Sequence, residues 1–255
     1  PELLEQLAKS IKKDGYVKHP IMVDEKSLVV LDGMHRVAAL KKLGCRRIPV
    51  CLVDYESPAV KVCSWYRTIK GAKPLELILA QAEQARSTLQ QTKELENTIG
   101  VSPIVAAIKT QDKAFLIKAF FKNLEEAYNI VKLIELRLKT VDFEVKYETE
   151  SDALRKLQQC KVDAVLCTPK LTKSAIVETA LSGRLFTYKA TRHVFPARAL
   201  NLNVPLNLLK DTKRPLNEVN AELRSMLQKR HLKRLPAGSI FKSKRYEEEL
   251  YVFEE

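Results

Sequence analysis

Several features that would place a protein in a special class are missing from this sequence. No segment of the 255 residues approaches the roughly 20 consecutive apolar residues that a membrane-spanning helix needs. No signal peptide is visible, and the five cysteines form no Cys-x-x-Cys pair, so neither a zinc site nor a disulfide framework is expected. Dispersed single cysteines are typical of a reducing compartment. We therefore expect a cytoplasmic protein without a membrane partner.

The chain is strongly basic, but it lacks the signatures of a nucleic-acid-binding module. Its formal net charge is +13, which would favour contacts with phosphates through counterion release. The positive charge is spread along the chain, and no arginine-rich arm, zinc finger or aromatic RNA-binding signature is found. The sequence therefore favours small anionic ligands, or simply a basic surface, over a nucleic-acid partner. It does not indicate an oligomeric state.

Hydrophobic periodicity predicts a small α/β domain over residues 1–72. The expected elements are a helix over 2–13, a hairpin with strands at 20–23 and 27–31, a helix over 35–43 and a strand over 48–53. The first helix is expected to bury one apolar face, formed by Leu3, Leu4, Leu7 and Ile11. Gly71–Pro74 is the best candidate for a domain boundary.

Residues 73–255 alternate helical and strand patterns, which predicts a second, larger domain of mixed α/β type. The expected helices cover 75–97, 123–138, 151–160, 173–182 and 216–230. The expected strands lie at 106–108, 114–119, 141–145, 164–167, 186–189, 193–195 and 250–253, and 197–210 is expected to be a loop. The fold class expected for the whole chain is α/β (α+β).

The segment Val30–Leu40, VLDGMHRVAAL, combines a strand-to-helix corner with three chemically active side chains. Gly33 permits a tight turn, and the helix that follows points its first N–H groups into it, which is a typical anion site. Arg36 adds a forked donor for phosphate oxygens, and His35 can donate to a phosphate or carry a proton.

Asp32 would repel a bare phosphate, so its presence needs another explanation. It can bind magnesium, orient His35, or accept a proton from a hydroxyl group. The alternative is that Asp32 is only the N-cap of the helix, with His35 and Arg36 as solvated first-turn residues. The spacing alone favours this second interpretation.

The wider segment 32–50, DGMHRVAALKKLGCRRIPV, resembles the ParB/sulfiredoxin superfamily, in which this corner cradles nucleotide phosphates. The resemblance covers residues 2–54. It implies a ParB/sulfiredoxin-like N-terminal domain at 1–72, followed by a C-terminal α/β domain at 73–255, with the active-site cleft between them.

Three branches of that superfamily can be compared with this chain. Sulfiredoxins carry a catalytic cysteine immediately before the His-Arg pair, and Met34 stands at that position here. Chromosome-partitioning proteins carry a Glu-Arg corner and a helix-turn-helix domain, whereas this chain has His35-Arg36 and alternating strands and helices. The third branch, the free serine kinases, phosphorylates L-serine with ADP or ATP.

Two further segments resemble the serine kinases. Cys63-Ser-Trp-Tyr66 contains the single tryptophan of the chain, and in that family an aromatic residue here packs against the amino acid. Residues 191–209, TRHVFPARALNLNVPLNLL, begin with Thr191, Arg192 and His193, a trio suited to the phosphate of O-phosphoserine. Without the resemblance, Trp65 would be expected in the core, and the trio in a strand with one functional face.

The resemblance implies a phosphotransferase that uses ADP or ATP with Mg²⁺. Gly33, Met34, His35 and Arg36 would hold the phosphates, Asp32 and His35 would be catalytic, and Trp65, Thr191, Arg192 and His193 would bind serine or phosphoserine. The family's general base is a glutamate expected upstream of Pro1, and Glu2 is not its equivalent. The runner-up is a ParB-like regulator that binds DNA and a nucleotide or other ligand. Neither the donor nor the pathway, cysteine biosynthesis or siderophore precursor supply, follows from the sequence.

Overall fold

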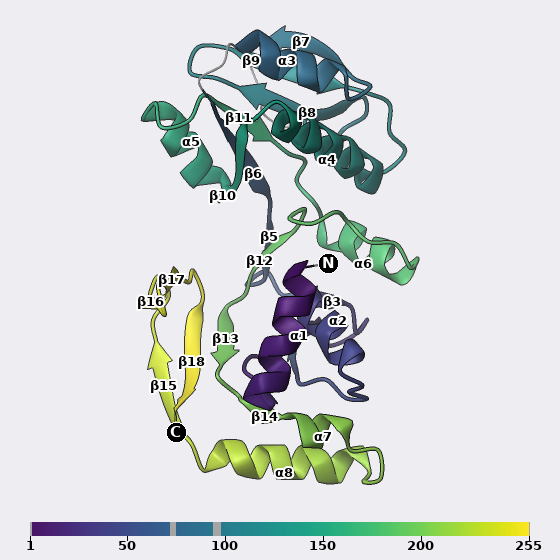
Figure 1. Ribbon diagram of the computed structural model, residues 1–255, viewed down its shortest axis with the longest axis vertical. Coiled ribbons are helices and arrows are strands. Elements are labelled where there is room, and N and C mark those ends of the chain that lie inside the picture. The colour runs from purple at the N-terminus through teal and green to yellow at the C-terminus, as the bar shows by residue number, and fades with distance from the viewer. Residues whose placement is uncertain (1, 72–74, 94–97, 255) are drawn as a thin grey trace. The chain divides into compact units, whose positions relative to one another are not determined.

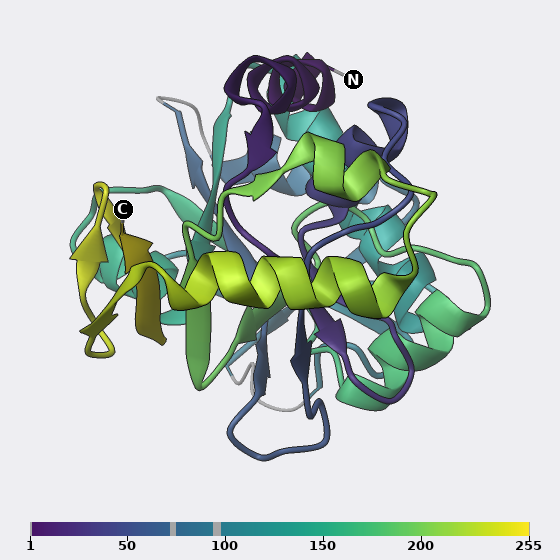
Figure 2. The ribbon, with the colours of Figure 1, turned by 90° about the horizontal axis from the view of Figure 1, so that it is seen from below.

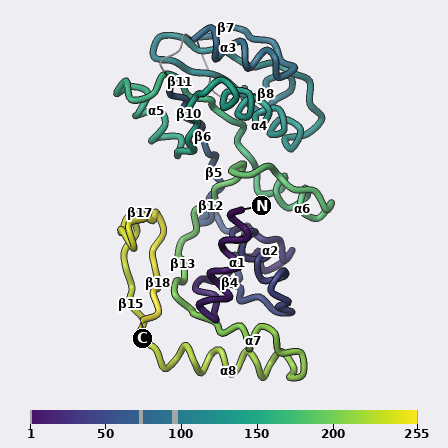
Figure 3. The backbone as a smooth tube through the Cα atoms, viewed as in Figure 1, coloured from purple at the N-terminus to yellow at the C-terminus, as the bar shows by residue number. Residues whose placement is uncertain are grey.

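The computed structural model describes residues 2–71, 75–93 and 98–254, and it divides into two compact units. Unit 1 combines the residues up to Lys61 with those from His193 onward, and unit 2 is the continuous segment Val62–Arg192. The path of the chain out of unit 1, through unit 2 and back can be followed by colour in Figure 3.

This division differs from the boundary expected between residues 72 and 73. The Gly71–Pro74 segment lies partly outside the described residues, and the chain instead leaves unit 1 after Lys61 and returns to it at His193. Residues 193–255, which we expected in the C-terminal domain, complete unit 1. The physical reason is that their apolar side chains share a core with the N-terminal segment.

The N-terminal part of unit 1 largely follows the predicted pattern. Its elements are α1 (Glu2–Asp14), β1 (Tyr16–Val17), β2 (Ile21–Asp24), β3 (Val30–Asp32), α2 (Met34–Lys42) and β4 (Val50–Val53). Strand β2 is the centre of a three-stranded sheet, antiparallel to β3 and parallel to β4. The predicted hairpin is thereby confirmed.

The C-terminal part of unit 1 contains more regular structure than we expected. Its elements are β13 (Ala197–Leu200), β14 (Val204–Pro205), α7 (Leu206–Lys210), α8 (Leu216–Gln228), β15 (His231–Leu235), β16 (Ile240–Phe241), β17 (Lys244–Arg245) and β18 (Glu249–Glu254). The expected loop over 197–210 is therefore wrong. Strand β13 pairs in parallel with β18, which pairs antiparallel with β15, and β14 pairs with β1. Helix α8, yellow-green, crosses the foreground of Figure 2.

One core joins the two parts of unit 1. Ile11 of α1 and Leu40 of α2 are buried together with Leu206 and Leu208 of α7 and Val219 of α8. At roughly 25 cal/mol per Å² of apolar area removed from water, such burial is the main stabilising contribution. The predicted apolar face of α1 is only partly correct, because Leu3 is 67% exposed.

Unit 2 is built on a six-stranded antiparallel sheet with the order β10-β6-β11-β8-β9-β7. Its strands are β6 (Trp65–Lys70), β7 (Thr88–Thr92), β8 (Ile104–Lys109), β9 (Ala114–Lys118), β10 (Glu144–Thr149) and β11 (Ala164–Cys167). Its helices are α3 (Leu75–Glu83), α4 (Leu124–Thr140), α5 (Glu150–Gln158) and α6 (Lys173–Leu181). The short strands β5 (Lys61–Cys63) and β12 (Arg192–Val194), where the chain passes between units, pair with each other. Figure 1 labels these elements.

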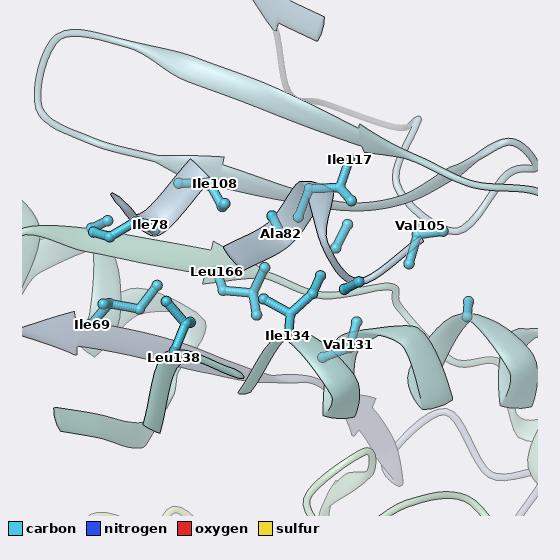
Figure 4. Close-up of a cluster of buried hydrophobic side chains, with 14 of the residues drawn as sticks. Ile69, Ile78, Ala82, Val105, Ile108, Ile117, Val131, Ile134, Leu138 and Leu166 are labelled. Carbon is cyan, nitrogen blue, oxygen red and sulfur yellow. The ribbon is translucent and has the colours of Figure 1, made fainter. Parts of the chain in front are cut away.

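Helices cover both faces of this sheet. In β11, Ala164 and Leu166 belong to the core under α3 and α4, while Val165 and Cys167 pack with α5, as the two-residue period of a strand requires. Figure 4 shows Val131, Ile134 and Leu138 of α4 directed at the strand residues of the first core. The predicted mixture of helices and strands is confirmed.

Two predicted elements of unit 2 are wrong. The helix expected over 75–97 ends at Glu83, because Arg86 adopts a left-handed backbone (φ 63°) and residues 88–92 pair with β9 as strand β7; residues 94–97 lie outside the described part. The strand expected at 186–189 is irregular and ends in a turn at Lys189, whose φ is 59°.

Candidate active site

The corner at residues 32–36 forms as expected, with Gly33 rather than Asp32 as the N-cap of α2. Strand β3 ends at Asp32, Gly33 has a left-handed φ of 105°, and α2 begins at Met34 without a side-chain cap hydrogen bond. A Cβ atom on Gly33 would lie 2.9 Å from Nη2 of Arg36. The left-handed φ is therefore the main reason for glycine at this position, and a Cβ atom would in addition displace the tip of the Arg36 side chain. The interpretation of Asp32 as a plain N-cap is not what the structure shows.

Two arginines hold the Asp32 carboxylate. Its Oδ2 lies 2.5 Å from Nη1 of Arg198 and 3.3 Å from Nη2 of Arg36. Arg198 also pairs with Glu248 at 3.1 Å. Burial by itself would raise the pKa of Asp32, but the charges of Arg198 and Arg36 outweigh it and hold that pKa below its ordinary value. Asp32 is therefore an ionised anchor for two guanidinium groups and a poor proton acceptor near neutral pH.

The other end of Arg36 is fixed by backbone carbonyls. Its Nη1 donates to the carbonyl oxygens of Pro20 at 2.5 Å and His19 at 3.1 Å. The His19 ring in turn accepts the backbone N–H of Asn201 at Nδ1, 3.1 Å away, which places the proton of the neutral ring on Nε2. Burial and then the charges of Arg36, Lys242 and Arg198 lower the pKa of His19 to about 4. His19 is thus a neutral donor among several cations.

Met34 and His35 occupy the exposed first turn of α2. Together with Asp32, Gly33 and Arg36 they form the single corner that the sequence predicted. Two partners of the corner were missed because they are distant in the sequence. Arg198 lies 166 residues from Asp32, and His19 lies 17 residues from Arg36. Arg198 stands within the segment 191–209 that carried the family resemblance, which is the one signal that could have drawn attention to it.

A chain of ring contacts connects His193 with the corner inside unit 1. Nε2 of His193 lies 2.8 Å from the hydroxyl of Tyr55, and its ring stacks on Phe195 with an interplanar angle of 18°. The Arg198 guanidinium also lies over the Phe195 ring, 5.2 Å from its centroid. Burial raises the pKa of Tyr55, so its hydroxyl stays protonated. His193 is therefore held in place by residues that the sequence did not single out.

The remaining predicted substrate residues gather around Trp65 in unit 2. The indole Nε1–H donates to the carbonyl oxygen of Thr191 at 3.1 Å. The guanidinium of Arg192 lies 5.8 Å from the centre of the same ring, and the Lys189 ammonium lies 4.0 Å from it. Trp65 is thus a partly exposed platform with two cations. The predicted trio 191–193 is divided, since Thr191 and Arg192 belong to unit 2 and His193 belongs to unit 1.

An apolar cavity of about 320 Å³ adjoins the corner in unit 1, a size within the usual range of small-molecule sites. Met22 in its wall pairs with Asp32 across β2 and β3, and Ala197 precedes Arg198 on β13. Phe195 and Val53 contribute further apolar surface, and Asp54 adds a carboxylate to the lining. The complete lining is Met22, Cys51, Leu52, Val53, Asp54, Ser57, Val60, Phe195, Pro196 and Ala197.

Within the described residues, no group of three or more His, Cys, Asp or Glu side chains could hold a metal ion. This does not conflict with Mg²⁺ arriving with a nucleotide, because Mg²⁺ is commonly bound by one or two carboxylates plus substrate phosphates. Asp32 is the carboxylate of the corner. No described helix combines the length and the apolar composition that crossing a membrane requires.

Comparison with known proteins first defines the N-terminal region: residues 1–64 match the ParB N-terminal domain family. Over most of its length the chain is similar to L-serine kinases. It is 28% identical to an ATP-dependent L-serine kinase of Staphylothermus marinus, covering 82% of this chain and 85% of that protein. It is also 28% identical to the ADP-dependent L-serine kinase SerK of Thermococcus kodakarensis, and the match covers 81% of this chain and 85% of that protein.

Solved structures agree with these relatives. A point variant of a free serine kinase in complex with AMP superposes with a TM-score of 0.71 at 27% identity, over 82% of this chain and 86% of that one. A C-terminally truncated SbnI from Staphylococcus aureus superposes with a TM-score of 0.68 at 23% identity, over 89% of each chain, which supports the fold alone. The resemblance to free serine kinases that the sequence predicted is confirmed.

Proposed function

We propose that this protein is a kinase that transfers a phosphoryl group from ADP or ATP to the hydroxyl group of free L-serine, giving O-phosphoserine. The observation that carries the proposal is the corner at residues 32–36, built as an anion site, in a chain similar to L-serine kinases over four fifths of its length. Phosphoryl transfer depends mainly on positioning and charge neutralisation, and the side chains around this corner are suited to both.

The nucleotide is assigned to unit 1. Gly33, Met34 and His35 contribute the turn and the first helical N–H groups, and Arg36 and Arg198 contribute guanidinium groups for the phosphates. Asp32 aligns these two arginines through its ion pairs. Because its pKa is lowered, Asp32 is assigned an orienting role rather than that of the general base. The adjoining apolar cavity, with Phe195 in its wall, is the assigned site of the adenine base.

Serine is assigned to the group around Trp65 in unit 2, with Thr191 and Arg192 as its polar contacts. In unit 1, His193, held by Tyr55, is assigned as a donor to a phosphate group. Mg²⁺ would bind with the nucleotide phosphates and neutralise their charge. Asp32 is the corner residue suited to hold it, directly or through water.

The alternative, a ParB-like DNA-binding regulator, has less support. Three relatives that match about four fifths of the chain are described as kinases, whereas one that matches 72% of it is described as a ParB-like protein. Several basic residues, such as Arg67, Arg198 and Arg214, pair with acidic residues within the fold. DNA binding would require a surface of basic side chains that are not already paired with acidic residues of the protein.

The test is an assay of the protein with L-serine, Mg²⁺ and either ADP or ATP, following O-phosphoserine together with AMP or ADP. We expect product with one of the two donors and loss of nearly all turnover in Asp32→Ala. The exposed Glu25→Ala serves as a matched control, because it also removes one carboxylate from unit 1. Absence of phosphoserine with both donors, or Asp32→Ala turning over like the unaltered protein, would reject the proposal.

A further inference from the structure

A second cavity of unit 1, with a volume of about 370 Å³, is lined mainly by polar side chains that the proposed function does not use. The lining contains the cations Lys18, Arg230 and Lys242 against one carboxylate, Glu254, so positive charge is in excess. It includes no residue of the corner or of the first cavity. The other lining residues are Tyr16, Asn201, Asn203 and Phe253. A cavity of this size can admit a small molecule.

Hydrogen bonds hold the walls of this second cavity together. The backbone N–H of Asn203 donates to the carbonyl oxygen of Lys18 at 3.3 Å. Nη1 of Arg230 donates to the carbonyl oxygen of Asn201 at 2.8 Å, and its Nη2 donates to that of Phe253 at 3.2 Å. Segments that are distant in the sequence are thus fixed around one space, which is what a preorganised binding site requires.

Two of the charged lining residues have partners of opposite charge. Lys18 lies 3.2 Å from Asp14, and Glu254 lies 3.7 Å from Lys233, which is not part of the lining. Both pairs are partly exposed to solvent, so each attraction is weak. The excess charge of the cavity therefore comes mainly from Arg230 and Lys242.

The charges of Arg230 and Lys242 are not neutralised. Arg230 donates to carbonyl oxygens, which have no net charge, and the Lys242 ammonium lies 5.5 Å from the centre of the Phe241 ring. Within the residues that the structure describes, neither cation takes part in an ion pair. The charge of Lys242 also reaches the cavity wall, because burial, Arg36 and then Lys242 lower the pKa of His19, whose Nδ1 accepts the N–H of a lining residue.

The backbone of Lys242 is unfavourable for a lysine. Lys242 and Ser243 form the turn between β16 and β17, in which Phe241 pairs with Lys244, and their φ values are 47° and 64°. Two-residue turns with positive φ at both positions favour Asn-Gly. A lysine here therefore carries conformational strain, and such strain is concentrated at functional positions.

Asn201 and Asn203 add uncharged donors to the lining. Both have a left-handed φ, 57° and 48°, which asparagine adopts more readily than most residues. Their side-chain amides have no hydrogen-bond partner in the part of the chain that the structure describes. Each amide offers two N–H donors, and Arg230 has further N–H groups beyond the three that its carbonyl bonds use.

We propose that this cavity is a second anion site of unit 1, separate from the corner, and that it binds a small organic phosphate with an apolar part, such as an aryl or alkyl phosphate. The phosphate group matches the two unpaired cations and the amide donors. The apolar part would lie against Tyr16 and Phe253. An ammonium group on the ligand would be repelled by Arg230 and Lys242, which disfavours O-phosphoserine at this site.

The side-chain NH2 signals of Asn201 and Asn203 in two-dimensional ¹H–¹⁵N NMR spectra report directly on this cavity. The protein is first saturated with ADP in the absence of serine, which fills the proposed nucleotide site. It is then titrated at constant ionic strength with phenyl phosphate, with phenol, which lacks the phosphate, or with O-phosphoserine, which lacks the apolar part. If ADP does not bind, the same signals in the free protein give the test independently of the kinase assignment.

Three variants are compared with the unaltered protein. Lys242→Asn removes a cation and suits the left-handed turn, and Asn203→Asp places a carboxylate in the lining at a position where Asp also tolerates a left-handed backbone. Lys244→Gln is the matched control, because Lys244 is an exposed cation of the same hairpin that is not part of the lining.

We expect phenyl phosphate to shift the two amide signals to saturation, whereas phenol and O-phosphoserine at the same concentrations should not. The Kd for phenyl phosphate should rise about fivefold in Lys242→Asn, the effect of losing one partly solvated charged donor, and at least as much in Asn203→Asp. Lys244→Gln should bind normally. The melting temperature of Lys242→Asn should equal or exceed that of the unaltered protein, because the turn strain is relieved.

Three results would overturn the proposal. Shifts that grow without saturation would indicate only a general ionic effect. Loss of phenyl phosphate binding on saturation with ADP would make the cavity part of the nucleotide site. An equal Kd in Lys242→Asn and Lys244→Gln would show that the cavity cations do not bind the phosphate.

Discussion

At the scale of single residues, the corner works through charges that are arranged by partners distant in the sequence. Asp32 was predicted from its place at the end of a strand, but its ion pair with Arg198 joins residues 166 positions apart. Short-range patterns cannot report such a pairing. Local patterns did identify Gly33 and Arg36, because both act over a short stretch of chain. Gly33 makes the left-handed turn, and Arg36 pairs with Asp32 four residues earlier.

His19 provides a prediction about pH at this scale. Because its pKa is lowered to about 4 in the folded protein, the unfolded chain binds the proton more strongly, and folding stability should fall as the pH drops from about 6.5 towards 4. His19→Asn keeps an acceptor for the Asn201 N–H and removes the titrating ring. We expect this variant to lose part of that pH dependence, on the order of 1 kcal/mol because the ring is partly exposed.

The measurement is urea unfolding at pH 4.5 and pH 7 for both proteins. The exposed His231 offers a control, since His231→Asn should keep the pH dependence of the unaltered protein. An unchanged difference between the two pH values in His19→Asn would contradict the assignment of His19 as a neutral, half-buried ring.

At the scale of elements, strand β6 connects the substrate platform with the interior of unit 2. It begins at Trp65, and two residues later Arg67 points into the core, where it pairs with the buried Glu135 of α4. Tyr147 of β10 donates to the other oxygen of Glu135 at 2.8 Å. Nη2 of Arg67 has no hydrogen-bond partner among the described residues. This ion pair ties together β6, β10 and α4 at one point.

Removing one member of this pair should be severe. Arg67→Met leaves the Glu135 carboxylate buried with a single hydrogen bond, and breaking a buried ion pair commonly costs about 3–5 kcal/mol. Urea unfolding monitored by circular dichroism would measure the loss. Lys146→Met, which breaks the exposed pair with Glu144, should leave the free energy of unfolding nearly unchanged, because solvent screens such a pair. Equal effects of the two substitutions would refute the importance of the buried pair.

The elements themselves were predicted best where the pattern was long or flanked by clear signals. Helix α4 and strand β11 fall close to their predicted ranges, since both combine strong apolar patterns with clear ends. Strand β7 was mistaken for helix because TLQQT has little hydrophobic alternation, and its pairing with β9 outweighs local propensity. Strand β6 was missed although it contains Trp65, because its sequence WYRTIK carries no regular alternation of apolar and polar residues, and its three buried residues are consecutive.

At the scale of the whole molecule, unit 2 is inserted between two segments that share one core. We predict that unit 1 can fold alone if residues 62–192 are replaced by a short Gly-Ser linker, because its core uses only residues of unit 1. The linked unit should bind ATP or ADP, measured by calorimetry, but should not respond to O-phosphoserine. The segment 1–61 alone should stay unfolded, since it lacks Leu206, Leu208 and Val219. A folded 1–61 fragment would contradict this account.

The shared core of unit 1 also has a consequence for synthesis of the chain. The ribosome completes the segment up to Lys61 and then roughly 130 further residues before His193 emerges, which takes on the order of 7–26 s at 5–20 residues per second. During that interval unit 2 can fold, while the apolar faces of α1 and α2 are not yet covered by α7 and α8. During synthesis the nascent N-terminal segment therefore exposes apolar surface of the kind that chaperones bind. Slow translation after residue 61 would lengthen the time for which this surface is exposed.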